Sequence, residues 1–353
     1  MREENIVVSI LIATYNSEKI LGKVLDAIRK QTYPQENIEI LIVDGGSTDA
    51  TKSMARQYGC RILDNPKTEP VNAKLIGMQN AKGKYLLTID HDEVFENLDS
   101  IKVRVDALQK YPQCKVAFCS GYKRPQNYPL LNQYISEFGD PFSLFMYNFS
   151  KDYHFYEKTL KKNYQLIYEN NEYICISFEK MKKIPIIELC CMGTLIDLDY
   201  FREKFSVQCN SAEMIHWFYA MLERGDKECI MSKNDPLVHY SVDSLMAYFP
   251  KLKWRICNNV HYAEKGENGF CGRLKYQKRI SYKKYLFMLY AIIPPISMIY
   301  AIYLAMSRRN PIYLLHPIFC FYVAFQIMWQ MCLKLLGITP EFKSYDGKKK
   351  IDR

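Results

Sequence analysis

The chain of 353 residues contains twelve cysteines but lacks any C-x-x-C pair. Without such a pair the common structural zinc frameworks are excluded. The adjacent Cys190 and Cys191 suit neither zinc nor an ordinary disulfide. We therefore expect reduced, mostly buried thiols in a cytosolic domain.

A secretory signal is also lacking at the start of the sequence. Residues 1–5 are largely charged, and the apolar run Ile6–Ala13 that follows is too short and has no cleavage site. We therefore expect the N-terminal part to stay in the cytosol.

Charge is missing from two long stretches near the C-terminus, Tyr285–Met306 (22 residues) and Asn310–Leu333 (24 residues). A helix needs about 20 apolar residues to cross a bilayer. The pattern predicts a transmembrane helical hairpin over residues 285–336, with both ends in the cytosol and Pro294 kinking the first helix. A re-entrant hairpin and two buried helices of a soluble domain are the alternatives.

Elsewhere the chain is basic, with a net charge of +10. Between Lys251 and Lys284 there are ten Lys or Arg against two Glu. Beside an apolar span, such a block favours anionic lipid headgroups over nucleic acid. We interpret residues 246–284 as a basic, amphipathic, membrane-proximal segment and 337–353 as a basic polar tail.

The N-terminal third alternates between short apolar runs and helical patterns, typical of an α/β fold with a mostly parallel sheet. The expected strands are 6–13, 38–43, 60–63 and 85–89, and the expected helices are 17–31, 49–58 and 70–81, with Ser17 as an N-cap. We place the boundary of this domain at 245 and interpret residues 121–185, which lack clear periods, as an insertion covering the site.

Acidic residues follow two of the predicted strands. Asp90 and Asp92 come after the fourth, and Asp44 opens the turn Asp44–Asp49 after the second. Ligands of such sheets bind at the carboxyl ends of strands. Two carboxylates there can hold one hard cation, which can hold a diphosphate, whereas the alternative is a solvated acidic turn. The two glycines after Asp44 allow close backbone approach to a ligand, or simply a tight, well-capped turn.

The segments VSILIATYNSEKILGKVLDAIRKQTYPQENIEILIVDGGSTDAT and AKGKYLLTIDHDE resemble a family-2 glycosyltransferase of GT-A fold. The resemblance covers residues 6 to about 95 and implies a Rossmann-like, mostly parallel sheet with flanking helices. It implies that Asp44 contacts the base, and that Asp90 and Asp92 bind ribose, diphosphate and a Mn²⁺ or Mg²⁺ ion. The remaining residues that it places around the nucleotide are Thr14, Tyr15, Asn16, Glu18 and Lys74, the last of which stands where the family often has arginine.

The second half resembles the family less. The usual acidic pair, with an aspartate as catalytic base, falls where this chain has Glu213 and Met214. Glu213 is the candidate base, and Asp197 and Asp199 are the others; a simple helix-start carboxylate is the alternative for Glu213. His239 resembles the late histidine that completes the metal shell in many GT-A enzymes, although a structural histidine is equally compatible.

The combined interpretation is a membrane protein with a cytoplasmic catalytic domain, anchored by a C-terminal hairpin. We expect inverting, metal-dependent transfer of a sugar from a nucleoside-diphosphate sugar to a membrane-associated acceptor, such as a lipid-linked glycan in cell-surface polysaccharide assembly. A Q-x-x-R-W motif is absent, which disfavours chain polymerisation. The alternatives are a polyprenyl-phosphate glycosyltransferase, whose ionised acceptor needs no strong base, and a non-catalytic nucleotide-sugar-binding membrane protein. Nucleic acid is not an expected partner.

Overall fold

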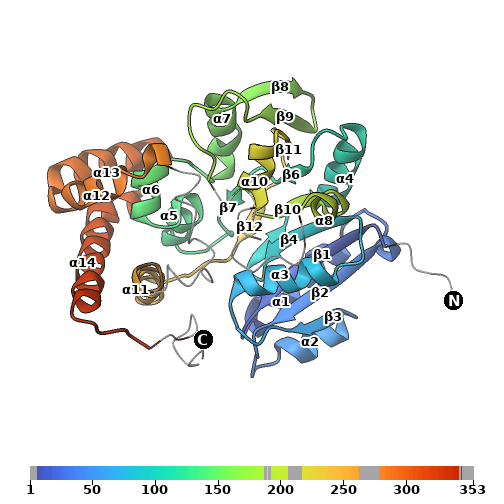
Figure 1. The fold of residues 1–353 in the computed structure, drawn as a ribbon, viewed down its shortest axis with the longest axis horizontal. Helices are drawn as coiled ribbons and strands as arrows, with labels where there is room; N and C mark the ends of the chain where they lie inside the picture. The colour runs from blue at the N-terminus through green and yellow to red at the C-terminus, as the bar shows by residue number, and fades with distance from the viewer. Residues whose placement is uncertain are drawn as a thin grey trace. The chain divides into compact units, whose positions relative to one another are not determined.

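The computed structural model describes residues 6–186, 189, 192–205, 217–261, 278–341 and 343, drawn in Figure 1. The chain forms two compact units. The first contains the residues up to Lys123 together with Tyr153–Tyr240, and the second contains Arg124–Asp152 and the described residues from Ser241 onward. Both units are therefore built from segments that are separated in the sequence.

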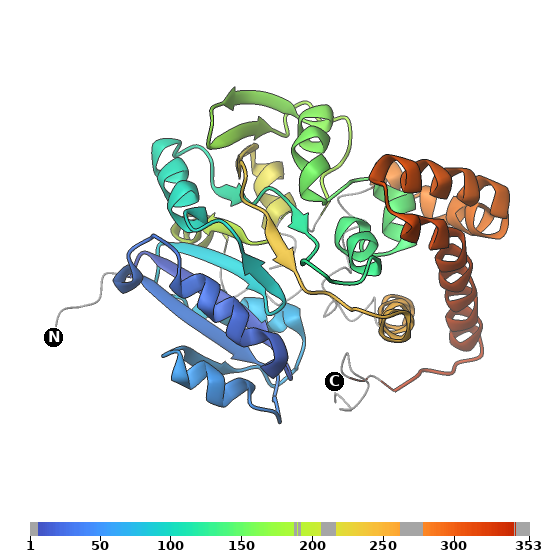
Figure 2. The ribbon, with the colours of Figure 1, turned by 180° about the vertical axis from the view of Figure 1, so that it is seen from behind.

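The first unit begins with the expected alternation of strands and helices. Four parallel strands stand in the order β3-β2-β1-β4. Figures 1 and 2, seen from opposite sides, show α3 and α1 on opposite faces of these strands. The bounds are β1 (Val8–Thr14), α1 (Glu18–Arg29), η1 (Gln35–Asn37), β2 (Ile38–Asp44), α2 (Thr51–Gln57), β3 (Arg61–Asp64), α3 (Pro70–Asn80) and β4 (Tyr85–Asp90).

The sheet continues beyond β4 with strands of mixed direction, so the expectation of a mostly parallel sheet holds only for its first four strands. β10 runs antiparallel to β4, and the order continues as β10-β6-β11-β9-β8. A small second sheet has the order β5-β12-β7. The bounds are β5 (Glu93–Phe95), α4 (Ser100–Lys110), β6 (Val116–Phe118), β7 (Tyr122–Lys123), α7 (Tyr153–Asn163), β8 (Gln165–Glu169), β9 (Tyr173–Ser177), β10 (Thr194–Asp197), α8 (Leu198–Lys204), α10 (Trp217–Arg224), β11 (Glu228–Ser232) and β12 (Leu237–His239).

Close packing between α3 and the sheet depends on one glycine. A Cβ added at Gly77 would meet the side-chain carbons of Leu11 at 2.4 Å, too close for any real contact. Glycine therefore lets α3 approach β1, and this places the start of α3 beside the carboxyl ends of the strands.

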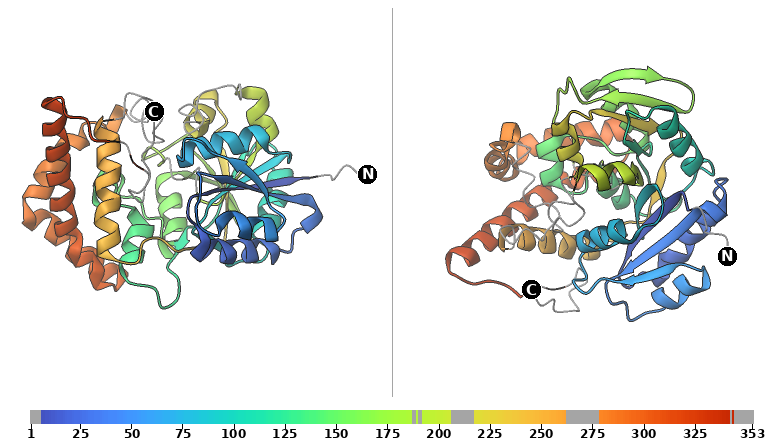
Figure 3. Two further views of the ribbon diagram at one scale, coloured as in Figure 1. Left: turned by 90° about the horizontal axis from the view of Figure 1, so that it is seen from below. Right: turned by 45° about the vertical axis from the view of Figure 1, so that its right-hand side comes forward.

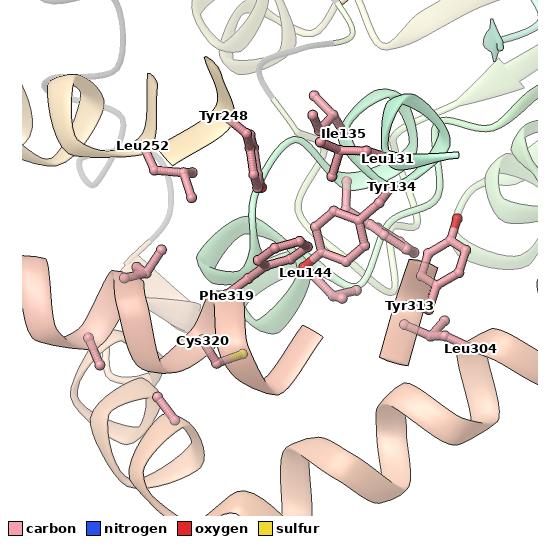
Figure 4. Close-up of a cluster of buried hydrophobic side chains, with 14 of the residues drawn as sticks. Leu131, Tyr134, Ile135, Leu144, Tyr248, Leu252, Leu304, Tyr313, Phe319 and Cys320 are labelled. Carbon is pink, nitrogen blue, oxygen red and sulfur yellow. The ribbon is translucent and has the colours of Figure 1, made fainter. Parts of the chain in front are cut away.

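The second unit is helical and has its own hydrophobic core, shown in Figure 4. Buried residues such as Tyr134, Phe287 and Phe319 come from both of its segments. The expected insertion 121–185 is thus divided, because residues 124–152 bury their apolar side chains in this core. The bounds are α5 (Leu131–Phe138), α6 (Pro141–Tyr147), α11 (Leu245–His261), η5 (Lys278–Ile280), α12 (Lys283–Ile292), α13 (Pro294–Arg308), η6 (Pro311–Leu315) and α14 (His316–Leu335).

The C-terminal helices differ from the expected pair of transmembrane helices. Within the part of the chain that the structure describes, one stretch, Pro311–Leu335, is a helix long and apolar enough to cross a membrane. The other expected span is broken into α12 and α13, which meet at an angle of 92°. The break lies at Pro294, as expected of a residue that cannot donate a backbone hydrogen bond. The expected hairpin of two spanning helices is not shown, because the bent pair suits either one broken span or a re-entrant loop.

Candidate functional site

The carboxylate of Asp44 organises the turn after β2. It is buried, and its oxygens accept hydrogen bonds from the Thr14 hydroxyl (3.0 Å), the Ser47 hydroxyl and the backbone N–H groups of Gly46 (3.0 Å) and Ser47 (2.8 Å). The Lys52 ammonium lies 3.3 Å away. Burial raises the pKa of Asp44, but the hydrogen bonds from Ser47, Thr14 and Gly46 outweigh it and hold the pKa below its ordinary value. The carboxylate is therefore ionised at neutral pH.

The turn after β1 packs against this second turn. Asn16 has a left-handed backbone, with φ of 49°, and its side-chain oxygen accepts a hydrogen bond from the Thr48 N–H at 2.9 Å. The Asn16 N–H in turn donates to the Ser47 hydroxyl at 2.9 Å. Tyr15 is half-buried at the start of the same turn. The expected nucleotide-contacting residues Thr14, Tyr15 and Asn16 are thus gathered beside Asp44.

Glu18 makes a structural contact that the sequence did not suggest. The Glu18 N–H donates to the Asp49 carboxylate at 3.1 Å, while the Ala50 N–H donates to the Glu18 carboxylate at 2.9 Å. Each acidic side chain therefore caps the other helix, α2 or α1. Ser17 occupies the N-cap position of α1, as expected, but its hydroxyl makes no capping hydrogen bond.

Asp90 and Asp92 flank the end of β4 and have different partners. The Lys74 ammonium of α3 lies 3.7 Å from the Asp90 carboxylate, whose side chain is 43% exposed. The Asp92 carboxylate lies 3.6 Å from Nε2 of His239. His239 reaches this position because β12 pairs with β5 in antiparallel register, with His239 opposite Glu93. The structure therefore forms two pairs after β4, Lys74 with Asp90 and Asp92 with His239. The ligand roles that the resemblance implies for these residues stay predictions.

Glu93 is a buried acid behind this pair that sequence reasoning missed. It accepts hydrogen bonds from the Asp90 N–H at 3.0 Å and from the Tyr122 hydroxyl. The Tyr122 ring stacks on His239, with centroids 4.4 Å apart. Burial, with Asp90 and Asp92 close by, raises the pKa of Glu93 well above its ordinary value. The sequence feature that could have identified Glu93 as buried is the alternation Glu93-Val94-Phe95. In a strand, this alternation puts Glu93 on the same side as the buried Phe95.

Two of the candidate bases lie at the wrong end of the sheet. Asp197 pairs with Tyr85, the first residue of β4, whereas Asp90 is the last. Five residues of strand separate those positions by about 16 Å, well beyond hydrogen-bond reach of a substrate held at Asp90. Asp197 instead caps α8 by accepting the Tyr200 N–H at 3.2 Å, and Asp199 lies in the first turn of that helix. Both are excluded as bases, while Glu213 lies outside the described residues.

The sequence matches the profile described as glycosyl transferase family 2 over residues 9–187, just over half of the chain. The chain belongs to this family. It is 34% identical over 118 residues to an uncharacterized glycosyltransferase of Rickettsia prowazekii, a match covering 33% of this chain and 36% of that protein.

A second relative has a more informative name. It is the dolichyl N-acetyl-alpha-D-glucosaminyl phosphate 3-beta-D-2,3-diacetamido-2,3-dideoxy-beta-D-glucuronosyltransferase of Methanococcus voltae, 34% identical over 110 residues, or 29% of this chain and 34% of that protein. The chain thus spans about a third of the length of both curated relatives. Among solved structures, a mannosyltransferase of Pyrobaculum calidifontis in complex with GDP-Man and Mn²⁺ aligns with a TM-score of 0.47 and 15% identity, covering 91% of this chain and 87% of that one.

Proposed function

We propose that this chain transfers a sugar from a nucleoside-diphosphate sugar to a membrane-associated, lipid-linked acceptor, with a divalent metal and with inversion at the anomeric carbon. The observation that carries the proposal is the approach of His239 to Asp92 beside Asp90 and Lys74, at the carboxyl end of β4. Ligands of open α/β sheets bind at that edge. The Methanococcus relative, whose name specifies a dolichyl phosphate sugar, supports a lipid-linked acceptor.

The donor atoms of Asp92 and His239 fit a divalent ion. Ligand atoms that lie about 2.1 Å from one ion can be no more than about 4.2 Å apart, and Oδ2 of Asp92 and Nε2 of His239 are 3.6 Å apart. Asp92 and His239 would hold the ion, whereas Asp90, the third metal ligand expected from the resemblance, does not complete a close group of three ligand atoms with them among the described residues. A divalent cation supplies positive charge against the diphosphate that leaves the sugar.

The remaining side chains act on the donor. The turns after β1 and β2 present Tyr15, Asn16 and Thr48 next to Asp44, a polar surface for the nucleoside. The Lys74 ammonium, 3.7 Å from Asp90, is placed to neutralise diphosphate charge. Because the Asp44 carboxylate already accepts four hydrogen bonds, contact with a base would need one of them to be exchanged.

Glu213 remains the proposed catalytic base for an acceptor hydroxyl. The exclusion of Asp197 and Asp199 favours the second candidate function, transfer to a polyprenyl phosphate, because an ionised acceptor needs no base. Glu213→Gln separates the two. It lowers turnover about 10²–10⁴-fold if a hydroxyl is deprotonated, and leaves turnover nearly unchanged if a phosphate attacks.

The test of the proposal is incorporation of radiolabel from a panel of nucleoside-diphosphate sugars into the lipid fraction of membranes that contain the full chain. Incorporation should require Mn²⁺ or Mg²⁺ and should be lost in Asp92→Asn and His239→Ala. Asp197→Asn is the matched control: it alters a strand-end acid at the opposite edge, keeps the helix cap, and should leave incorporation intact.

A chain that binds a donor in calorimetry but transfers no sugar to any lipid fraction would instead be the non-catalytic nucleotide-sugar binder. Metal-independent incorporation, or full activity in His239→Ala and Asp92→Asn, would contradict the assigned metal ligands.

A further inference from the structure

Large apolar side chains are exposed on the outer faces of α12, α13 and α14 in the second unit. Ile299 is 71% exposed, Phe321 62% and Phe325 50%. Along α14 the exposed residues recur as Ile318, Phe321, Phe325 and Met328, which is one stripe of a helix. Contiguous apolar surface of this kind marks an interaction site.

The dimensions of α12 and α13 do not suit a span. Their 10 and 15 residues correspond to about 15 and 22 Å of helix, and the hydrocarbon core of a bilayer is about 30 Å thick. A bend of 92° between them shortens their combined reach.

Both ends of this bent pair contact the same short segment, residues 131–147. Near its start, the Phe287 ring lies 5.0 Å from that of Phe142 in α6. At its end, the Arg308 guanidinium donates to the buried Glu137 carboxylate of α5 at 2.8 and 3.0 Å. α5 and α6 have 8 and 7 residues, too few to reach across a bilayer. The pair therefore begins and ends on the same side.

A helix that carries three basic residues, α11, accompanies α14 along its length. Figure 3 (left) shows α11 and α14 side by side. The contacts run from Tyr322, whose hydroxyl donates to the Phe249 carbonyl at 3.1 Å, to Lys334, whose ammonium donates to the Val260 carbonyl at 2.9 Å. α11 carries Lys251, Lys253 and Arg255. If α14 crossed a membrane, these charges would enter the hydrocarbon, at a high cost in free energy.

Basic residues lie at the helix ends, and exposed aromatic residues lie along the helices. Lys283 and Lys284 begin α12, and Lys334 lies at the end of α14. Tyr285 is 70% exposed, Tyr303 59% and Trp329 51%. Lysine complements anionic headgroups, and tyrosine and tryptophan favour the boundary between headgroups and hydrocarbon.

We propose that the second unit attaches to one leaflet of an anionic phospholipid bilayer through the outer faces of α12, α13 and α14, and that none of these helices crosses it. This inference goes beyond the proposed function, which needs only a membrane-associated acceptor. Its tests measure topology and vesicle binding rather than sugar transfer, so the membrane-attachment proposal and the proposed function can fail independently.

Topology is tested with Ser307→Cys in the full chain, expressed in cells and treated with a membrane-impermeant maleimide; peptide mass mapping identifies the labelled site. Ser307, in the last turn of α13, is exposed. We expect labelling in inverted membrane vesicles and none in intact spheroplasts. Glu341→Cys, beyond α14, is the matched control and should label on the same side as position 307. Labelling of position 307 on the opposite side from position 341 would overturn the proposal and establish the spanning hairpin.

Attachment is tested by sedimentation of the purified full chain with phosphatidylglycerol–phosphatidylcholine vesicles. Ile299→Glu and Phe325→Glu should each weaken binding at least about tenfold, because an apolar contact is lost. Leu98→Glu, a control of similar exposure (51%) in the first unit, should bind normally.

Lys283→Gln with Lys284→Gln should weaken binding to anionic vesicles about 25-fold, at roughly fivefold per charge, and leave binding to pure phosphatidylcholine unchanged. The proposal would be overturned if all variants bound vesicles equally. It would also be overturned if the protein bound no vesicles and formed a stable dimer in solution, because a second copy would then cover the apolar faces.

Discussion

At the scale of single residues, the buried carboxylate of Asp44 is the best defined feature of the site. Four hydrogen bonds keep it ionised, and one of them comes from a side chain, Thr14, that can be replaced by the nearly isosteric valine. Removal of one hydrogen bond to a buried charge costs about 1.5–3 kcal/mol. We expect Thr14→Val to lower the free energy of unfolding by about this amount at pH 7.

The sign of the pH dependence follows from the lowered pKa of Asp44. A carboxyl whose pKa is lower in the folded state contributes stability above its unfolded pKa, near 3.8, and loses it as pH falls through the folded pKa. The deficit of Thr14→Val should therefore be largest at neutral pH and shrink below about pH 4, as measured by urea denaturation across that range. A deficit independent of pH would show that the hydroxyl acts through packing alone.

Tyr122 is the second residue whose role can be isolated. Tyr122→Phe keeps the ring that stacks on His239 but removes the hydroxyl that donates to the buried Glu93. We expect a loss of about 1–3 kcal/mol in stability, with retention of metal-dependent activity below the melting temperature. Tyr122→Ala should also raise the metal concentration needed for half-maximal activity, because His239 loses the ring that stacks on it. If the two variants gave equal activities, the stack would have no positioning role.

At the scale of elements, the second unit depends on a buried ion pair between α5 and the end of α13. Burial raises the pKa of Glu137, and Arg308 opposes that shift. Arg308→Met should destabilise the unit by about 3–5 kcal/mol, because an uncompensated charge remains. The double variant Glu137→Gln/Arg308→Met should recover much of this loss in thermal denaturation, whereas two independent structural roles would give additive losses.

Elements whose partners are near in the sequence were predictable. Strands such as Val8–Thr14 are uncharged, β-branched and followed at once by a helix with apolar residues at helical spacing, so local pattern determined both. The acids at the ends of β2 and β4 could be located for the same reason. Glu93 was missed because its partner Tyr122 lies 29 residues away.

The C-terminal helices show that amino-acid composition alone does not predict whether an apolar helix faces lipid or a protein core. Absence of charge over Tyr285–Met306 predicted a lipid-facing helix, but Phe287 and Leu304 face a protein core. Hydrophobicity alone does not distinguish those environments. The local sequence pattern did not predict the helices within residues 131–147, because their apolar side chains pack against helices that begin more than a hundred residues later.

At the scale of the whole molecule, the two units share one chain in an interleaved order. Truncation after Asp243 removes the partners of α5 and α6, exposing Phe138, Leu144 and the buried Glu137. We expect this truncated chain to aggregate during purification. A chain that also has 124–152 replaced by a short Gly/Ser linker should stay soluble, because Lys123 and Tyr153 already lie close, with the ammonium 5.6 Å from the ring. Solubility of the simple truncation would contradict the assignment of 124–152 to the second unit.

The separation of Glu137 and Arg308 in the sequence also determines when the second unit can fold during synthesis. Its partners are 171 residues apart, and a ribosome that adds about 5–20 residues per second needs roughly 10–35 s to make the second after the first. For that interval α5 and α6 have emerged without the helices that cover them. A nascent chain halted at residue 240 should therefore bind, through these two helices, to chaperones that recognise exposed apolar segments or to the membrane surface. Release of the chain from a chaperone should coincide with completion of α14. The order of synthesis thus exposes α5 and α6 to other binding partners before the second unit can fold.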